Sequence, residues 1–207
     1  GSDSANTIAE EADVILSVGC RLQDFTTGSW TAFAKDAQII SLNAGRHEAG
    51  KHRSLPIVGD AKRGLLQLAD ALSEYKAPTD WTNFAKAERA KWTAYVADNV
   101  KPGNRPNSYA QAIGTINALC DLRDRVVAAA GGLPAEVTAN WRTLDNGTVD
   151  VEFGFSCMGY EIAGGWGARI AQSENEPDAD TIVFCGDGSY MLMNSDIYSA
   201  VLTEKKM

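Results

Sequence analysis

One acidic residue between two glycines is the strongest chemical signal in the sequence. The segment 180–189 is a short apolar run that ends in Gly-Asp-Gly-Ser and leads into helix-like sequence. A buried strand that passes into a helix at this point brings free backbone N–H groups and the carboxylate of Asp187 together. The amides and the helix dipole attract an anion, and a carboxylate is a ligand for a divalent cation. The segment therefore predicts a metal ion bridged to a phosphate, with an ordinary Asp-Gly turn as the alternative.

Two further turns carry glycine. Gly131 and Gly132 follow the strand-like run 125–130, and the stretch 155–160 opens a helix rich in small residues. Ligands of an open parallel sheet bind outside the carboxyl ends of its strands, so we expect all three turns to meet at one edge of a sheet. Backbone amides in such turns can hold a polyanion, and one acidic residue adds a metal-bridged diphosphate. Tight packing is the alternative for each turn taken singly.

The elements that position these turns follow from the apolar runs. The runs are continuous rather than alternating, which is typical of strands buried on both faces of a parallel sheet. We therefore predict an α/β fold of parallel sheets flanked by helices. Strands are expected at 13–19, 38–43, 55–60, 125–130 and 180–185, and helices at 29–34, 61–72, 81–96 and from residue 108 onward. Asp60 and Ser108 are placed to cap the helices that follow them.

A change of composition near the middle of the chain predicts a domain boundary. Residues 76–80 interrupt the strand–helix alternation, and two prolines and a glycine fall within 99–107. We expect one domain at 1–75, a helical linker at 76–107 and a second domain at 108–207. The chain has no Met at residue 1 and stops where a further strand is expected. We therefore expect two Rossmann-like domains, both incomplete, within a longer protein.

Composition excludes several classes of protein. The 207 residues carry a net charge of −8, with a pI near 4.8, which is opposite to the basic surface of a nucleic-acid-binding protein. No apolar run is long enough for a membrane span, and no signal peptide opens the chain. The four cysteines are far apart and form no CxxC pair, which is typical of free thiols in a reducing compartment. We expect no nucleic-acid or membrane partner and a cytoplasmic location.

The three turns, in this order, resemble the diphosphate-binding domain of thiamine-diphosphate-dependent enzymes. The segment 13–72 resembles the later part of their central domain, and the runs 17–22, 26–28 and 57–60 are similar to acetolactate-synthase-like enzymes. The resemblance covers essentially the whole chain, as parts of two domains. It implies thiamine diphosphate and Mg²⁺ as cofactors.

The resemblance also implies a set of contacts for this cofactor. Asp187 would be a Mg²⁺ ligand, and the second side-chain ligand of the family, an Asn, would fall after Met207. Ser156 would accept a hydrogen bond from the aminopyrimidine through its backbone carbonyl, and Met158 would hold the cofactor bent. The other implied contacts are Gly131, Gly132, Leu133, Cys157, Gly186, Gly188 and Ser189.

No catalytic residue is expected within this chain. In the family, a glutamate that activates the aminopyrimidine comes from an earlier domain of a second subunit. The resemblance thus implies a homodimer or homotetramer for the intact protein, and an inactive isolated segment that binds the cofactor weakly. His47 and His52 lie in a polar loop of the other domain, and we interpret them as surface residues rather than catalytic bases.

Three functions remain open from the sequence. The run 152–165 is similar to one group of this family, and that resemblance implies a hydrolase that opens a cyclic 1,2-diketone to 5-deoxy-glucuronate in inositol catabolism. A carboligase acting on pyruvate is the nearer alternative, but Ala163 replaces the proline that is typical of those enzymes. A non-catalytic nucleotide-binding module is the third. No G-x-G-x-x-G follows the strand at Val14, and Asn43 stands where a ribose-binding acid is expected, so the sequence weighs against it.

Overall fold

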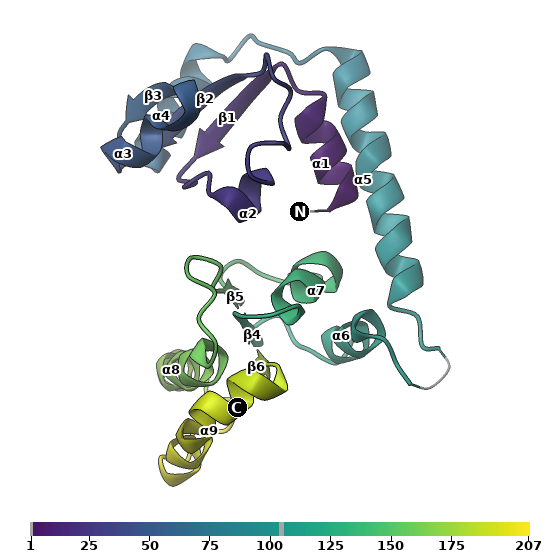
Figure 1. The fold of residues 1–207 in the computed structure, drawn as a ribbon, viewed down its shortest axis with the longest axis vertical. Coiled ribbons are helices and arrows are strands. Elements are labelled where there is room, and N and C mark those ends of the chain that lie inside the picture. Colours follow the sequence, from purple (N-terminus) through teal and green to yellow (C-terminus); the bar gives the residue numbers. More distant parts are fainter. Residues whose placement is uncertain (1, 104–105) are drawn as a thin grey trace. The chain divides into compact units, whose positions relative to one another are not determined.

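The computed structural model describes residues 2–103 and 106–207 (Figure 1). The chain forms two compact units that divide between Ala94 and Tyr95. Residue 1 of the predicted domain 1–75 and residues 104–105 of the predicted linker 76–107 lie outside the described residues. The helix α5 (Thr79–Asn99) runs across the division. The predicted domain limits themselves stay a prediction.

The first unit contains a parallel sheet in the order β1-β2-β3. Its strands are β1 (Val14–Val18), β2 (Gln38–Asn43) and β3 (Leu55–Val58). Its helical elements are α1 (Asp3–Glu10), α2 (Asp24–Thr27), α3 (Arg46–Ala49), the 3₁₀ turn η1 (Lys51–Arg53) and α4 (Ala61–Ala71), followed by the start of α5. The three strands predicted in this half are confirmed, and β3 pairs with β2 alone among the described strands.

Local sequence explains how α4 joins this sheet. The Asp60 carboxylate accepts the N–H of Arg63 at 2.8 Å, which confirms the predicted cap. Gly64 faces the side chain of Leu42, and a Cβ at this position would clash with the leucine methyl groups. The absence of a side chain at Gly64 therefore lets α4 lie close against β2.

The short helix predicted at 29–34 is wrong. The structure places a helix earlier, at α2, and ends it at Gly28. Ser29 and Trp30 then take φ of +52° and +68°, which a right-handed helix cannot contain. The side chain of Trp30 stacks on His52, so the aromatic residue organises a turn rather than a helix face.

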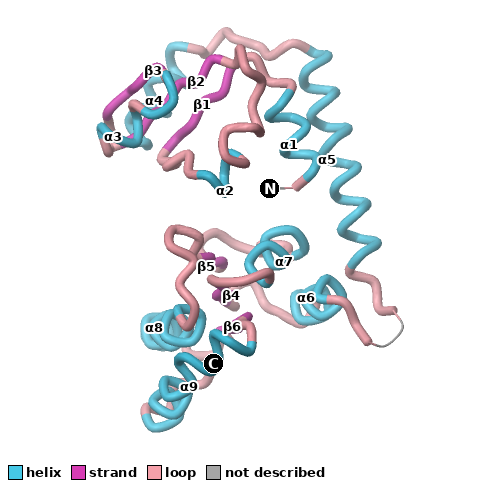
Figure 2. The backbone as a smooth tube through the Cα atoms, in the orientation of Figure 1, coloured by secondary structure: helices cyan, strands magenta, loops and turns pink. Residues whose placement is uncertain are grey.

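The second unit contains the sheet β5-β4-β6, again parallel. Its strands are β4 (Arg125–Ala128), β5 (Val149–Val151) and β6 (Thr181–Phe184), and its helices are α6 (Tyr109–Asn117), α7 (Leu133–Asn140), α8 (Tyr160–Asn175) and α9 (Asp187–Leu202). Figure 2 shows α6 and α7 on one side of this sheet and α8 on the other. The predicted α/β class, with parallel sheets flanked by helices, is confirmed.

The core of the second unit is built around β4. Val126, Val127 and Ala128 are completely buried, and Ile113 of α6 and Val137 of α7 pack into the same core. Burial of each valine or isoleucine side chain contributes about 1.5–3 kcal/mol to folding. The cap predicted at Ser108 is confirmed, and the structure extends it to a capping box in which Ser108 and Gln111 are bonded reciprocally. The central strand of this sheet is therefore fixed from both sides.

No helix in the described ranges 2–103 and 106–207 has both the length and the apolar character needed to cross a membrane. The 21-residue α5 is the longest of the described helices, but Lys86, Glu88, Arg89 and Lys91 lie within it.

Candidate functional site

The predicted turns meet at the carboxyl ends of β4 and β6. A hollow of about 290 Å³ is lined there by Tyr109, Ala130, Gly131, Gly132, Leu133, Met158, Gly186, Asp187, Gly188 and Ser189. Eight of the ten residues selected from the sequence line this hollow. Ser156 and Cys157, the other two, precede α8 and lie outside its lining.

The turn after β4 leaves its backbone accessible. Gly131 takes φ of +80°, a conformation that glycine adopts at little cost and other residues rarely adopt. Gly132 is the residue before α7, and its carbonyl accepts the N–H of Glu136. A Cβ at Gly131 or Gly132 would meet no atom within 4 Å and would project into open space. These glycines therefore leave room for a group to approach the first amides of α7.

The turn after β6 also places a glycine with open space beside it before a helix, and it adds a carboxylate. Gly186 lies before α9, and its Cα also borders open space. Asp187 is exposed in the first turn of α9, where its Oδ1 accepts the N–H of Gly188 at 2.9 Å. Two helices, α7 and α9, thus present their N-terminal turns, which carry partial positive charge, to one hollow.

Asp187 is the only acidic residue in the lining of the hollow. Within the described residues, no three histidine, cysteine or acidic side chains gather closely enough to hold a metal ion. Mg²⁺ keeps several waters and is commonly held by one or two carboxylates together with phosphate oxygens. The donor set of this chain therefore fits one protein ligand of a phosphate-bridged Mg²⁺, and does not form a metal site by itself.

Met158 forms an apolar wall of the hollow. Its side chain is 53% exposed, and its terminal methyl would lie 2.7 Å from a Cβ placed on Gly188. The glycine therefore admits the methionine beside the Gly-Asp-Gly turn. A flexible thioether at this point can adapt to the shape of a bound ring system.

A second carboxylate organises the loop before α8. Glu152 accepts the N–H of Phe155 at 2.8 Å and that of Cys157 at 2.9 Å. These backbone hydrogen bonds, chiefly that from Cys157, hold the pKa of the Glu152 carboxyl below its usual range. Ser156 sits between the two donors with φ of +52°. The loop is thus fixed by Glu152, although Ser156 and Cys157 do not line the hollow.

The sequence reasoning missed a third carboxylate. Glu161, in the first turn of α8, is completely buried. It accepts the N–H of Ala130 at 3.0 Å, the N–H of Gly159 at 2.9 Å and the hydroxyl of Ser189 at 3.0 Å. The signal for it was present, because Glu161 is the only charged residue in the stretch 153–168.

Small residues in α8 and directly before it pack against neighbouring elements, as their number predicts. Gly165 faces Val183 of β6, and Gly159 faces Met193 of α9. A Cβ at either glycine would overlap the facing side chain. Close packing therefore explains these two glycines without a bound group. The helix end that carries Glu161 is held against both β6 and α9.

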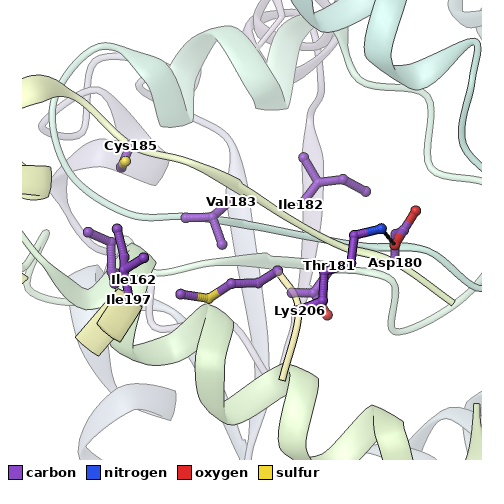
Figure 3. A pocket seen from close by; sticks show the side chains of 9 residues that line it. Ile162, Asp180, Thr181, Ile182, Val183, Cys185, Ile197 and Lys206 are labelled. Carbon is purple, nitrogen blue, oxygen red and sulfur yellow. Dashed lines mark hydrogen bonds and ion pairs between the residues drawn. The ribbon is translucent and has the colours of Figure 1, made fainter. Parts of the chain in front are cut away.

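A larger hollow of about 430 Å³ lies beside β6, and none of the turn glycines lines it (Figure 3). Figure 3 shows the aliphatic side chains of Ile162, Val183 and Ile197 around it. Its charged residues, Asp180 and Lys206, pair with each other at 3.4 Å. This hollow lacks the glycine turns and the converging donors of the first one. The smaller hollow is therefore the candidate site.

Two family models match the chain. The central domain of thiamine pyrophosphate enzymes matches residues 1–68, and their C-terminal TPP-binding domain matches residues 129–207. The second match contains every residue selected for the site.

Curated relatives match over the whole chain. It is 34% identical to 3D-(3,5/4)-trihydroxycyclohexane-1,2-dione hydrolase of Geobacillus thermodenitrificans, and covers 35% of that protein. It is 31% identical to the hydrolase of the same name from Bacillus anthracis and 33% identical to hydrolase 1 of Bacillus cereus, covering 36% of each. The chain thus spans about a third of the length of these relatives.

Proposed function

The chain belongs to the thiamine pyrophosphate enzymes, of which it carries central-domain and C-terminal-domain sequence, and we propose that its glycine-turn hollow binds thiamine diphosphate with Mg²⁺. The observation that carries this proposal is the meeting of three separate turns at one hollow. Two of them leave open space beside glycine Cα atoms at helix N-termini, which suits close approach of a diphosphate.

The chain's own residues would bind and orient the cofactor. The amides that follow Gly131 and Gly132 would hold the diphosphate from one side, and those of Gly188 and Ser189 from the other. Asp187 would hold Mg²⁺ through its exposed carboxylate. Leu133 and Met158 would supply apolar contacts, with Met158 supporting the bent shape.

When bound, the cofactor supplies an electron sink for breaking a carbon–carbon bond next to a carbonyl. The direct roles implied for Ser156 and Cys157 stay predictions, because neither residue lines the hollow. Glu152 would act on them only by fixing the loop that contains both.

We propose that the intact protein hydrolyses a cyclic 1,2-diketone, opening 3D-(3,5/4)-trihydroxycyclohexane-1,2-dione to 5-deoxy-glucuronate. Support comes from relatives of that name with 31–34% identity across the whole chain. The resemblance adds an activating glutamate from another domain and a homodimeric or homotetrameric assembly. We also propose a cytoplasmic location, because the four cysteines are free thiols.

The test uses the full-length protein with thiamine diphosphate and Mg²⁺. It is offered the trihydroxycyclohexane dione and, separately, pyruvate, and the products are identified by mass spectrometry. We expect ring opening of the dione with one water added, and no acetolactate. Formation of acetolactate from pyruvate would contradict the proposed substrate but would agree with the proposed cofactor. Turnover of neither substrate, with no cofactor bound, would contradict the proposed function.

A further inference from the structure

The buried carboxylate of Glu161 joins all three turns of the candidate site. Ala130 and Ser189 line the hollow themselves, and Gly159 follows Met158, which also lines it. Each of these three residues donates a hydrogen bond to Glu161 at 2.9–3.0 Å. One side chain thus connects the end of β4, the start of α8 and the start of α9.

We propose that Glu161 is a positioning residue that sets the spacing of the three cofactor-binding turns, an inference that rests on the proposed function. Glu161 does not line the hollow, so it acts through the groups that do. With its carboxylate in place, the turn at Gly131 and the turn at Gly188 are held in one arrangement before any ligand arrives. A site arranged in advance binds more tightly, because less ordering is needed on binding.

The chemistry of the three partners explains why a carboxylate is needed here. Two backbone N–H groups and one hydroxyl converge, and all three act as donors. An ionised carboxylate only accepts hydrogen bonds, whereas a glutamine also donates through its NH₂ group. A buried carboxylate is unfavourable unless its oxygens are hydrogen-bonded, and here both oxygens are. The positive end of the α8 dipole favours the same charge.

The nearby thiol of Cys185 responds to the same group. Burial, and after it the charge of Glu161, raises the pKa of the Cys185 thiol. The thiol follows β6 and therefore lies near the turn that Glu161 holds. Cys185 thus feels the charge of Glu161, but it donates no hydrogen bond to that carboxylate and has no part in positioning the turns.

A second buried polar side chain of α8 links the helix to the sheet without any contact with the candidate site. Gln172, 3% exposed, donates to the carbonyl of Arg123 at 2.8 Å and accepts the hydroxyl of Thr181 at 2.7 Å. It ties α8 to the opposite, amino-terminal ends of β4 and β6. A neutral amide is sufficient there, far from the hollow. Gln172 is therefore a control for Glu161, because it is a buried polar residue of the same helix whose partners lie away from the hollow.

The experiment compares Glu161→Gln and Gln172→Ala in the full-length protein. Three quantities are measured: the unfolding temperature without cofactor, the Kd for thiamine diphosphate in saturating Mg²⁺, and the hydrogen exchange of the Ala130 and Gly159 amides. We expect both variants to unfold at lower temperature. Only Glu161→Gln raises the Kd, by at least about tenfold, as is typical when a supporting hydrogen-bond partner is lost.

Hydrogen exchange reports on the hydrogen bonds from the Ala130 and Gly159 amides to Glu161 in the absence of cofactor. In Glu161→Gln at least one of the two amides, Ala130 or Gly159, exchanges faster than in the wild type, because the NH₂ group of glutamine must face one of them, whereas Gln172→Ala leaves both unchanged. A glutamine can satisfy some of the three donors but leaves at least one unpaired. Should Glu161→Gln not fold, Glu161→Asp keeps an acceptor-only group that is one methylene shorter, and we expect a smaller rise in Kd.

Two results would overturn the inference. One is a Kd within about twofold of the wild type for the folded Glu161 variant while its unfolding temperature falls, which is the behaviour of a purely structural group. The other is an equal rise of Kd in Gln172→Ala. If the wild type itself binds no thiamine diphosphate, the proposed function fails instead, and the exchange measurement still reports on Glu161.

Discussion

The two sheets have the same parallel topology but very different burial. In the second unit Val126, Val127 and Ala128 of β4 are completely buried. In the first unit every residue of β3 is exposed, with Leu55 at 63% and Ile57 at 45%. A continuous apolar run thus predicts a parallel strand but not how much of it is covered. The candidate site lies at the end of the strand that is packed from both sides.

The turns of the two units are also built differently. Around the hollow of the second unit, glycines leave open space, and the buried Glu161 holds the backbone from beneath. In the first unit the turns place Trp30 and His52 at positive φ and stack their rings. The stacked side chains of Trp30 and His52 therefore fill the space between their two turns in the first unit, whereas the turns at Gly131 and Gly186 keep their backbone accessible. This difference supports the choice of the hollow in the second unit as the candidate site.

The largest expected effect is a difference in stability between substitutions in the two sheets. Ile113→Ala removes a side chain that is 1% exposed in the core around β4, and we expect it to lower the free energy of unfolding by about 2–5 kcal/mol. Ile57→Ala, at 45% exposure on β3, should cost less than about 1 kcal/mol. Urea unfolding of each variant measures both. An equal cost for the two would mean that the β3 face is covered in the protein.

A smaller effect is expected for alanine substitutions at one glycine turn of each unit. Gly131 and Gly19 both end a strand at positive φ, +80° and +64°, and a Cβ at either meets no atom within 4 Å. We expect Gly131→Ala and Gly19→Ala each to cost about 1–2 kcal/mol of stability through backbone strain. Only Gly131→Ala should also weaken thiamine diphosphate binding, because its Cβ would enter the hollow. Calorimetric titration of the full-length variants separates the two effects.

A reduced affinity in Gly19→Ala, equal to that in Gly131→Ala, would contradict the placement of the site. It would show that backbone strain alone, and not the position of the Cβ, lowers the affinity.

The smallest effect concerns two carboxylates with pKa values below the usual glutamate value of about 4.3. The hydrogen bond and charge of Lys51 lower the pKa of Glu48, whereas backbone N–H groups lower that of Glu152. Salt screens charges but not local backbone hydrogen bonds. We expect the Glu48 pKa to rise toward its ordinary value in 1 M salt, and the Glu152 pKa to stay nearly constant, in an NMR titration of the side-chain carbons.

The direction of the pH effect follows from the lowered pKa of Glu152. Its contribution to the order of the loop 152–157 is present above the ordinary glutamate pKa and is lost as pH falls through the lower folded value. The amide resonances of Phe155 and Cys157 should therefore shift with a midpoint below about 4.3. A midpoint above that value would contradict the hydrogen bonds to Glu152.

Patterns of local sequence were enough to predict most of the framework. Apolar runs predicted β1 to β4 and β6, and polar residues before helices predicted the caps at Asp60 and Ser108. The strand β5 was missed because it has three residues, with an exposed aspartate at its centre. The helix α7 was missed because its eight residues show no clear apolar periodicity, although Pro134 is a typical residue of a first helical turn.

The site was only partly predictable. The glycine turns are local signals, and eight of the residues they indicate do line one hollow. Glu161 is different, because its role depends on donors at Ala130 and Ser189, which are 31 and 28 residues away in the chain. A buried hydrogen-bond network of this kind appears only when the fold brings distant turns together. The prediction of a helix at 29–34 was wrong for a related reason, because the ring of Trp30 stacks on His52 from another loop.

The most direct measurement is calorimetric titration of thiamine diphosphate into the full-length protein, with and without Mg²⁺, using the wild type, Asp187→Asn and Asp180→Asn. Asp180 is an exposed aspartate at the opposite end of β6 and serves as the control. We predict Mg²⁺-dependent binding to the wild type, a Kd at least about tenfold higher in Asp187→Asn, and a Kd within about twofold of the wild type in Asp180→Asn. Equal binding to the wild type and Asp187→Asn would contradict the assignment of the hollow as the cofactor site.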